Sequence, residues 1–199
     1  MTIIPKSPAA LECSIDQVNW SEEYPYKPEV KCRLSHDSKW LFLEYEVNEK
    51  ATKAEESRLG EAVYEDSCVE FFIKPEGGRY YYNFEFNAIG CMSLARRLTR
   101  DEKVSAPMDV LRSVKCESSL GSAPFAEKTL GQSWTLKVDI PIGALYESGL
   151  TTWDGLECSI NLYKCGDGLS EPHFLSWAPI SHPTPNFHLP EFFRKVRME

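Results

Sequence analysis

The chain has 199 residues, a formal net charge of −8, and 42% hydrophobic and 12% aromatic residues. This hydrophobic content is enough to fill a core, which excludes an intrinsically disordered chain. The acidic balance, without a basic cluster, argues against nucleic acids and anionic membranes as partners, because binding phosphates requires Lys and Arg side chains.

Seven cysteines are spread along the chain without a CxxC pair. Several stand in apolar strand patterns, where a free thiol behaves as a small hydrophobic side chain. The pattern favours a reducing environment over a disulfide framework or a zinc knuckle. The start, MTIIPKSPAALECS, lacks the apolar run of a signal peptide or membrane span. We expect no membrane insertion, and a cytoplasmic protein as the chain stands, or an exported one if a signal has been removed.

Strand patterns dominate the first half of the chain. The alternation of apolar and polar residues predicts strands at 30–34, 40–47, 67–74, from 79 onward after a turn at 75–78, and at 91–98. The polar segment 48–64 predicts a long loop that contains a helical turn.

The second half continues the same pattern. It predicts strands at 113–118, 133–141, 156–166 and 173–179, and a last strand near the C-terminus. The segment 142–149 suits one short helix, ended by Gly149. We find no repeat and no linker. The whole pattern predicts a single all-β domain over residues 1–199, a two-sheet antiparallel sandwich of jelly-roll or immunoglobulin-like type with at most one or two short helices.

The segment around the turn at 75–78 predicts a β-hairpin with two distinct faces. A four-residue turn would pair Lys74 with Arg79, and therefore Phe72 with Tyr81, Glu70 with Asn83 and Cys68 with Glu85. Strand alternation assigns Tyr80, Tyr82, Phe84 and Phe86 to the core face.

The other face of this hairpin is polar. Glu70, Asn83, Glu85 and Asn87 converge on it. Carboxylates on adjacent strands repel each other, and the simplest interpretation is a face exposed to water. The alternative is a site for a polyhydroxylated ligand or a cation, because carboxylates and amides bind vicinal hydroxyls and oxygen ligands suit calcium.

Five segments of the chain resemble a known family. The strings EDSCVEFFIKP, YYYNFEFNAIG, NLYKCGDG, PHFLSWAPI and PNFHLPEFF follow the order and spacing found in proteins like carbohydrate-binding module family 9, within the wider group of DOMON-like sandwiches. The resemblance runs from about Asp16 to the end of the chain. It is closest to the subgroup found with glycoside hydrolases and polysaccharide degradation, xylan included.

The resemblance implies non-catalytic binding of a mono- or oligosaccharide, typically at a chain end, between two aromatic rings. Those rings fall on Tyr64 and Phe187, and the hairpin glutamate of the family falls on Glu70. Polar contacts to sugar hydroxyls fall on Glu85 and Asn87. To these we add Asn83, on the same face of the hairpin, and His188, which follows Phe187. The complete set expected to meet sugar hydroxyls is Glu70, Asn83, Glu85, Asn87 and His188.

The chain departs from the family pattern in its rings and charges. The best-studied members carry tryptophan at both ring positions and a basic residue near the position of Glu85, which leaves the sugar preference open. Structural calcium is a further family feature, whose ligands the sequence does not locate. A glycoside hydrolase is the implied protein partner.

Three other functions remain open at this stage. Glu70 and Glu85 could form the carboxylate pair of a glycosidase, although the chain lacks GxSxG, HExxH and P-loop motifs. A DOMON-like haem module would need axial ligands, for which Met92, Met108, His173 and His188 are available. The third alternative is a sandwich that serves only as an interaction scaffold.

Overall fold

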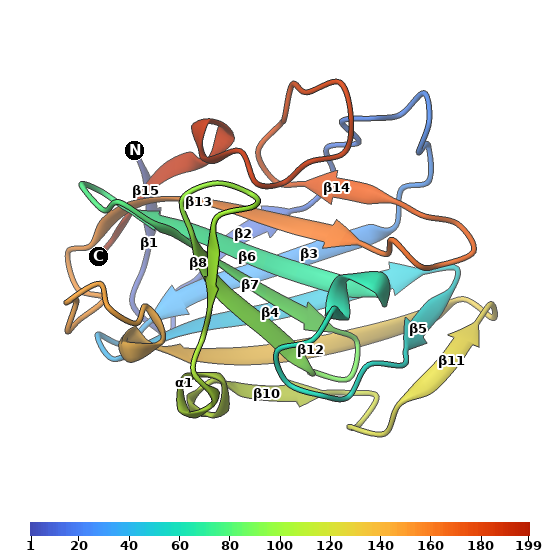
Figure 1. The fold of residues 1–199 in the computed structure, drawn as a ribbon, viewed down its shortest axis with the longest axis horizontal. Helices are drawn as coiled ribbons and strands as arrows, with labels where there is room; N and C mark the ends of the chain where they lie inside the picture. The colour runs from blue at the N-terminus through green and yellow to red at the C-terminus, as the bar shows by residue number, and fades with distance from the viewer.

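Strands make up most of the regular structure, with only short helical segments between them (Figure 1). The computed structural model describes residues 1–199. Its helical segments are α1 (Met108–Ser113) and the 3-10 helices η1 (Val63–Glu65), η2 (Ile142–Ala144) and η3 (Pro190–Phe192). None of them has the length and apolar character needed to cross a bilayer.

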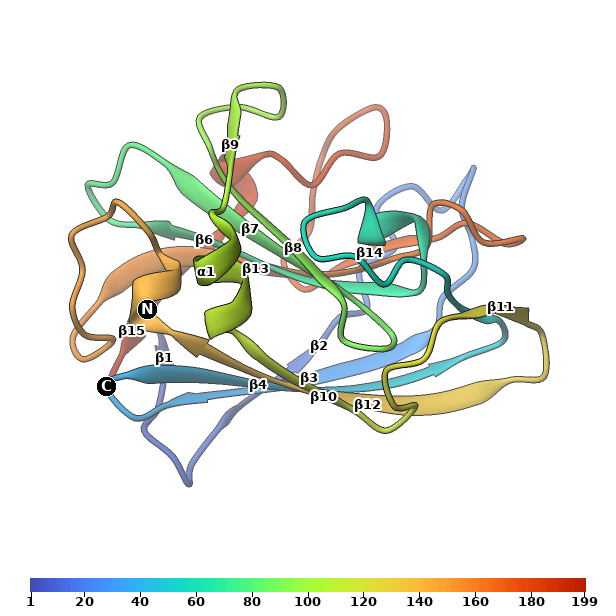
Figure 2. The same ribbon diagram turned by 60° about the horizontal axis from the view of Figure 1, so that its bottom comes forward.

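Two large sheets face each other (Figure 2). The larger has the order β1 (Thr2–Ile4), β15 (Arg194–Met198), β13 (Glu157–Cys165), β6 (Cys68–Pro75), β7 (Tyr81–Asn87), β8 (Met92–Arg97) and β9 (Lys103–Ser105), and β14 (Phe174–Ser176) also pairs with β13. The smaller has the order β10 (Lys115–Ser118), β12 (Gln132–Pro141), β4 (Trp40–Glu49), β3 (Glu29–His36) and β2 (Leu11–Ser14). A separate ribbon pairs β11 (Phe125–Lys128) with β5 (Thr52–Ala54). The predicted all-β sandwich is confirmed.

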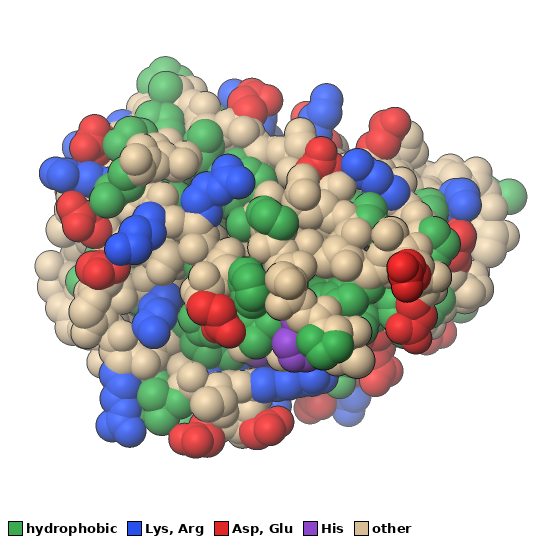
Figure 3. Space-filling model, turned by 90° about the horizontal axis from the view of Figure 1, so that it is seen from above, with side chains coloured by type: hydrophobic (Ala, Val, Ile, Leu, Met, Phe, Trp, Pro, Cys, Tyr) green, Lys and Arg blue, Asp and Glu red, His purple; other side chains and the backbone are tan.

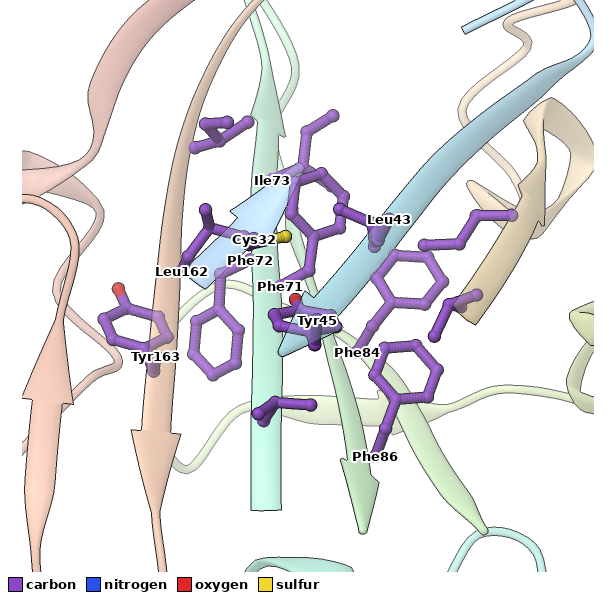
Figure 4. Packing of buried hydrophobic residues seen from close by; sticks show 14 of the residues in the cluster. Cys32, Leu43, Tyr45, Phe71, Phe72, Ile73, Phe84, Phe86, Leu162 and Tyr163 are labelled. Carbon is purple, nitrogen blue, oxygen red and sulfur yellow. The ribbon is translucent and has the colours of Figure 1, made fainter. Parts of the chain in front are cut away.

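The core lies between the two large sheets. Alternate residues of β6 and β7, such as Phe71 and Phe84, point toward the smaller sheet and meet Leu43 and Tyr45 of β4 (Figure 4). Phe72 lies on the other side of β6 with Tyr163, where their ring centroids are 4.9 Å apart (Figure 4). The larger sheet therefore buries side chains on both of its faces. Many antiparallel sheets instead bury one face and expose the other to water.

Several details of the sandwich differ from the prediction. The sheets are not wholly antiparallel, because β1 runs parallel to β15 where the two ends of the chain meet. The sequence pattern also missed β1, β2, β5, β9, β11 and α1, which have only three to six residues each, too few to establish a period. Segment 142–149 forms only the short η2, since Glu147 adopts a left-handed conformation (φ 58°) that an α-helix does not allow.

The predicted hairpin register is wrong by two residues. Glu70 pairs with Glu85, Phe72 with Asn83 and Cys68 with Asn87. The connection is longer than four residues, because β6 ends at Pro75 and β7 begins only at Tyr81. A shift of two residues keeps every side chain on its face, so the division into an apolar and a polar face holds.

Tyr80 does not belong to the core, contrary to the prediction. It precedes β7 and remains half-buried. The guanidinium of Arg96 lies 4.6 Å from the centroid of its ring, and that of Arg79 lies 5.4 Å away. Because the connection is longer than predicted, Tyr80 lies outside β7 and does not follow the alternation of the strand. Its ring therefore contacts these two guanidinium groups instead of the core.

Candidate functional site

The polar face of the β6–β7 hairpin looks away from the smaller sheet. The C-terminal loop, η1 and the β8–β9 hairpin all lie on this side of the larger sheet (Figure 2). At one end of the face, the ring of Phe72 packs 5.1 Å from the imidazole of His188, and that of Tyr81 packs 6.0 Å from the ring of Phe193. This end is closed by the C-terminal segment, and the other end forms the floor of a pocket.

The pocket has a volume of about 520 Å³. Segments far apart in the sequence contribute its walls: η1 and the residues before it, the β8–β9 hairpin, the end of β13 and the C-terminal loop. It is lined by Gly60, Glu61, Ala62, Tyr64, Glu70, Glu85, Ser93, Arg97, Arg100, Asp101, Lys103, Cys165, Asp167, Phe174, Pro185, Asn186, Phe187 and His188.

Both predicted aromatic rings line this pocket, but they are held differently. Phe187 is 8% exposed and stacks on Tyr163, with ring centroids 4.2 Å apart and planes 11° from parallel. The Tyr163 hydroxyl also donates a hydrogen bond to the Phe187 carbonyl (3.2 Å). Tyr64 is 40% exposed, and its backbone carbonyl accepts the N–H of Asp167 (3.2 Å). The pocket thus joins one ring fixed by packing to one ring free to meet a ligand.

Glu70 and Glu85 form the floor. They face each other directly across β6 and β7 and are only 3% and 6% exposed. Burial, followed by the charge of Glu85, raises the pKa of Glu70 well above its ordinary value. Burial also raises the pKa of Glu85, with the charge of Arg97 opposing it. The floor therefore consists of two adjacent carboxyl groups that are shielded from bulk water.

Asn83 lies beneath the floor and does not line the pocket. It is fully buried, and its amide nitrogen donates to Oε1 of Glu85 (2.8 Å). Its amide oxygen accepts the Nε–H of Arg97 (2.7 Å), whose guanidinium also donates to the Arg100 carbonyl. Asn83 therefore positions Glu85 and Arg97 relative to each other.

Asn87 also lies outside the pocket lining. Its amide nitrogen donates to Oδ2 of Asp66 (2.9 Å) and to the carbonyl of Glu56 (2.8 Å). Its amide oxygen accepts the N–H of Cys91 (2.9 Å). These bonds use the whole amide to anchor the segment that leads into η1.

His188 lines the pocket as a neutral ring. Its Nδ1 lies 3.1 Å from the Tyr81 hydroxyl. Burial lowers the pKa of His188 to about 3, and the positive charges of Arg97, Arg100 and Lys103 add to this effect.

Strand alternation did not predict the basic wall of the pocket or three of its acids, Glu61, Asp101 and Asp167. Arg97 stands opposite Tyr81 in the ladder, so alternation along β8 could have placed it on the polar face. Lys103 begins the unpredicted β9, for which the sequence carries no strand signal, and Arg100 lies in the turn between β8 and β9. Asp167 comes two residues after Cys165, and burial raises its pKa to about 6.

Figure 3 shows the molecule from above, where acidic, basic and hydrophobic side chains intermingle without a large patch of one charge.

The four candidate haem ligands lie in different surroundings. Met92 is in the core, Met108 is exposed at the start of α1, and His173 is fully buried beside Lys164. Only His188 lines the pocket.

One group of side chains is close enough together to hold an ion. It consists of Cys68, Glu70 and Cys165, whose ligand atoms lie within 4.8 Å of one another. Calcium takes oxygen ligands, so two thiols and one carboxylate do not fit the calcium that the resemblance implies.

Comparisons with known proteins identify the family. The model of carbohydrate-binding family 9 matches residues 4–198. A solved structure of a Bacteroides uniformis protein classed as carbohydrate-binding is 37% identical to the chain, covers 100% of it and 98% of its own length, and has a TM-score of 0.94. No curated protein matches the chain.

Two further solved structures share the fold. They are of a family 9 module from Caldicellulosiruptor kristjanssonii, one in complex with glucose and one with cellotriose. The glucose complex is 12% identical to this chain in sequence and the cellotriose complex 11%, and both have a TM-score of 0.54. Each comparison covers 100% of this chain, with 96% of the glucose-bound chain and 93% of the cellotriose-bound chain. The match of the family model over nearly all residues shows that the chain belongs to carbohydrate-binding family 9.

Proposed function

We propose that the chain binds a mono- or oligosaccharide, without catalysis, in the pocket between Tyr64 and Phe187. One observation carries this proposal: a single pocket joins two aromatic rings to a floor formed by a pair of buried carboxyl groups. Rings offer flat apolar area to the C–H face of a sugar, and carboxyl groups bind its hydroxyls. The sugars bound by the structural relatives, glucose and cellotriose, support a ligand of this class.

A chain end is the form of ligand that the family resemblance favours, and the size of the pocket is compatible with it. Glu70 and Glu85 form its floor, and the fully buried Asn83 lies behind Glu85. The volume of about 520 Å³ falls in the range of small-ligand sites.

The lining suggests a division of roles. We expect Glu70, Glu85, Arg97 and His188 to meet the sugar hydroxyls, since their side chains reach the pocket. Asn83 and Asn87, expected from the sequence to do the same, would act indirectly because protein groups already occupy their amides.

The family match supports a binding function over hydrolysis. The model that matches residues 4–198 is that of a carbohydrate-binding family, and the structures with glucose and cellotriose are of a binding module from the same family. A binding module of this kind would serve a glycoside hydrolase that acts on the same polysaccharide, for which xylan is our first candidate.

Titration calorimetry against glucose, xylose, galactose, cellobiose and xylobiose tests the proposal. We expect one of these sugars to bind, and Tyr64→Ala and Phe187→Ala each to weaken binding about tenfold or more, the equivalent of roughly 1.4 kcal/mol. Tyr80→Ala, which removes an aromatic ring outside the pocket lining, is the matched control. Heat from none of the five sugars, or equal binding by all three variants, would refute the site. Sugar release from a dye-labelled polysaccharide would show catalysis instead.

A further inference from the structure

Two free cysteines and a glutamate meet at the floor of the pocket. Cys68 on β6 and Cys165 on β13 are direct partners in the ladder, and Glu70 stands two residues after Cys68 on the same face of β6. The Cys165 thiol lies 3.1 Å from Oε1 of Glu70. All three side chains are almost completely buried, with exposures of 0%, 1% and 3% for Cys68, Cys165 and Glu70.

The spacing of these atoms suits a small thiophilic cation. Zn²⁺ binds thiolate sulfur at about 2.3 Å and carboxylate oxygen at about 2.0–2.2 Å. In a tetrahedral site, two sulfurs are then about 3.8 Å apart, and sulfur and oxygen about 3.5 Å apart. The three ligand atoms already lie within 4.8 Å of one another, so small side-chain rotations suffice. All three ligands lie on the paired strands β6 and β13, which fixes their relative positions.

The cluster also leaves one coordination position open. Cys165 and Glu70 line the pocket, whereas the neighbouring Cys68 is fully buried and does not line it. An ion held by three protein ligands keeps a fourth position for water or a substrate atom, as open zinc sites do. Here that position would face the pocket, between the cluster and Asp167, which also lines it.

We propose that Cys68, Cys165 and Glu70 bind a thiophilic divalent cation, Zn²⁺ being the best match, at the floor of the sugar pocket. The two thiols, and the Glu70 carboxyl where it carries a proton, release their protons to solvent when the ion binds. The ion's open position then meets water, or a hydroxyl of a ligand in the pocket. This site is separate from any calcium site, because its donors are mainly sulfur.

Cobalt titration of the reduced, metal-free protein provides the test. Co²⁺ bound to thiolates absorbs in the near ultraviolet through sulfur-to-metal charge transfer, and we expect this absorbance to saturate at one ion per chain. Zn²⁺ should displace the cobalt and raise the melting temperature, because an ion that binds only the folded state stabilises it. Neither effect depends on a sugar, so failure of the ion site would leave the sugar site standing.

Variants locate the ion. Cys165→Ser should reduce the charge-transfer absorbance at saturating cobalt by about half and weaken Zn²⁺ binding by about a hundredfold. Glu70→Gln should weaken Zn²⁺ binding while keeping the full absorbance. Cys116→Ser is the control, since this half-buried cysteine on β10 lies outside the cluster. The proposal fails if the wild-type protein shows no charge-transfer absorbance, or if Cys165→Ser and Cys116→Ser behave alike. If Cys165→Ser does not fold, Cys68→Ser takes its place. In either case the proposal also fails if Zn²⁺ does not raise the melting temperature of the wild-type protein.

Discussion

Lys164 on β13 and Glu49 on β4 form an ion pair across the core, with the ammonium nitrogen 2.9 Å from Oε2 of the carboxylate. Both side chains are completely buried, and each belongs to a different sheet. The ammonium group also donates to the Cys165 carbonyl (2.8 Å), and Oε1 of Glu49 accepts the indole N–H of Trp134 (2.7 Å). The pair therefore joins the two sheets next to the strand end that carries Cys165.

We predict that Lys164→Met lowers the free energy of unfolding by about 3–5 kcal/mol, because it leaves the Glu49 carboxylate buried without its cation. The double variant Lys164→Met with Glu49→Gln should recover much of this loss, since the amide oxygen still accepts from Trp134. Urea unfolding at pH 7 measures both. Lys50→Met, which breaks the exposed pair with Glu171, should cost less than about 1 kcal/mol. Equal losses in the single and double variants would contradict the prediction.

His173 makes the stability depend on pH. Burial and the charge of Lys164 lower the pKa of His173 to about 2, whereas an unfolded histidine titrates near 6.5. Below pH 6.5 the unfolded state takes up a proton that the folded state does not, so the free energy of unfolding falls as the pH falls. This histidine alone should contribute a loss of about 2 kcal/mol between pH 7 and pH 5.

His173→Gln isolates this contribution. His188, and the carboxyl groups with raised pKa values, remain in both proteins, so their effects cancel in the difference. The stability gap between wild type and variant should therefore narrow by about 2 kcal/mol from pH 7 to pH 5, as measured by urea unfolding at both values. A gap that stays constant would mean that His173 titrates in the folded protein as it does in the unfolded one.

The sequence was sufficient to predict the sandwich and the two faces of the β6–β7 hairpin. Strand alternation has a period of two, so even a register error of two residues leaves Glu70 and Glu85 on the polar face. Alternation does not tell which part of a polar face is covered. Here the contact of His188 with Phe72, more than a hundred residues apart in the sequence, closes one end of the face and leaves the other as a pocket.

The roles of the two asparagines were beyond sequence analysis for a related reason. A polar side chain on a strand looks the same whether it meets a ligand or a buried protein group. The partner of Asn87 is Asp66, at the end of η1, and the partners of Asn83 are Glu85 and Arg97. Only the path of the chain around the hairpin brings these groups together.

Asn87 should act on stability and not on sugar binding. Asn87→Asp removes the donor to Asp66 and to the Glu56 carbonyl and adds an acid beside Asp66, so we expect a loss of about 2–4 kcal/mol. Sugar affinity, measured by calorimetry at a temperature where the variant is folded, should stay within about twofold of wild type. Weaker binding with unchanged stability would instead place Asn87 in contact with the sugar.

Tyr163 should control how well Phe187 is positioned for a sugar. Tyr163→Phe keeps the ring stack at the base of Phe187 but removes the hydrogen bond from the hydroxyl to the Phe187 carbonyl. The loop loses one buried contact worth about 1 kcal/mol, and we predict about fivefold weaker binding of the sugar found by calorimetry. Tyr82→Phe is a close control, because it removes a buried hydroxyl that donates to the Tyr146 carbonyl (2.8 Å) outside the pocket lining. It should lose similar stability and keep its affinity. If both variants bind the sugar as the wild type does, Phe187 is held by packing alone.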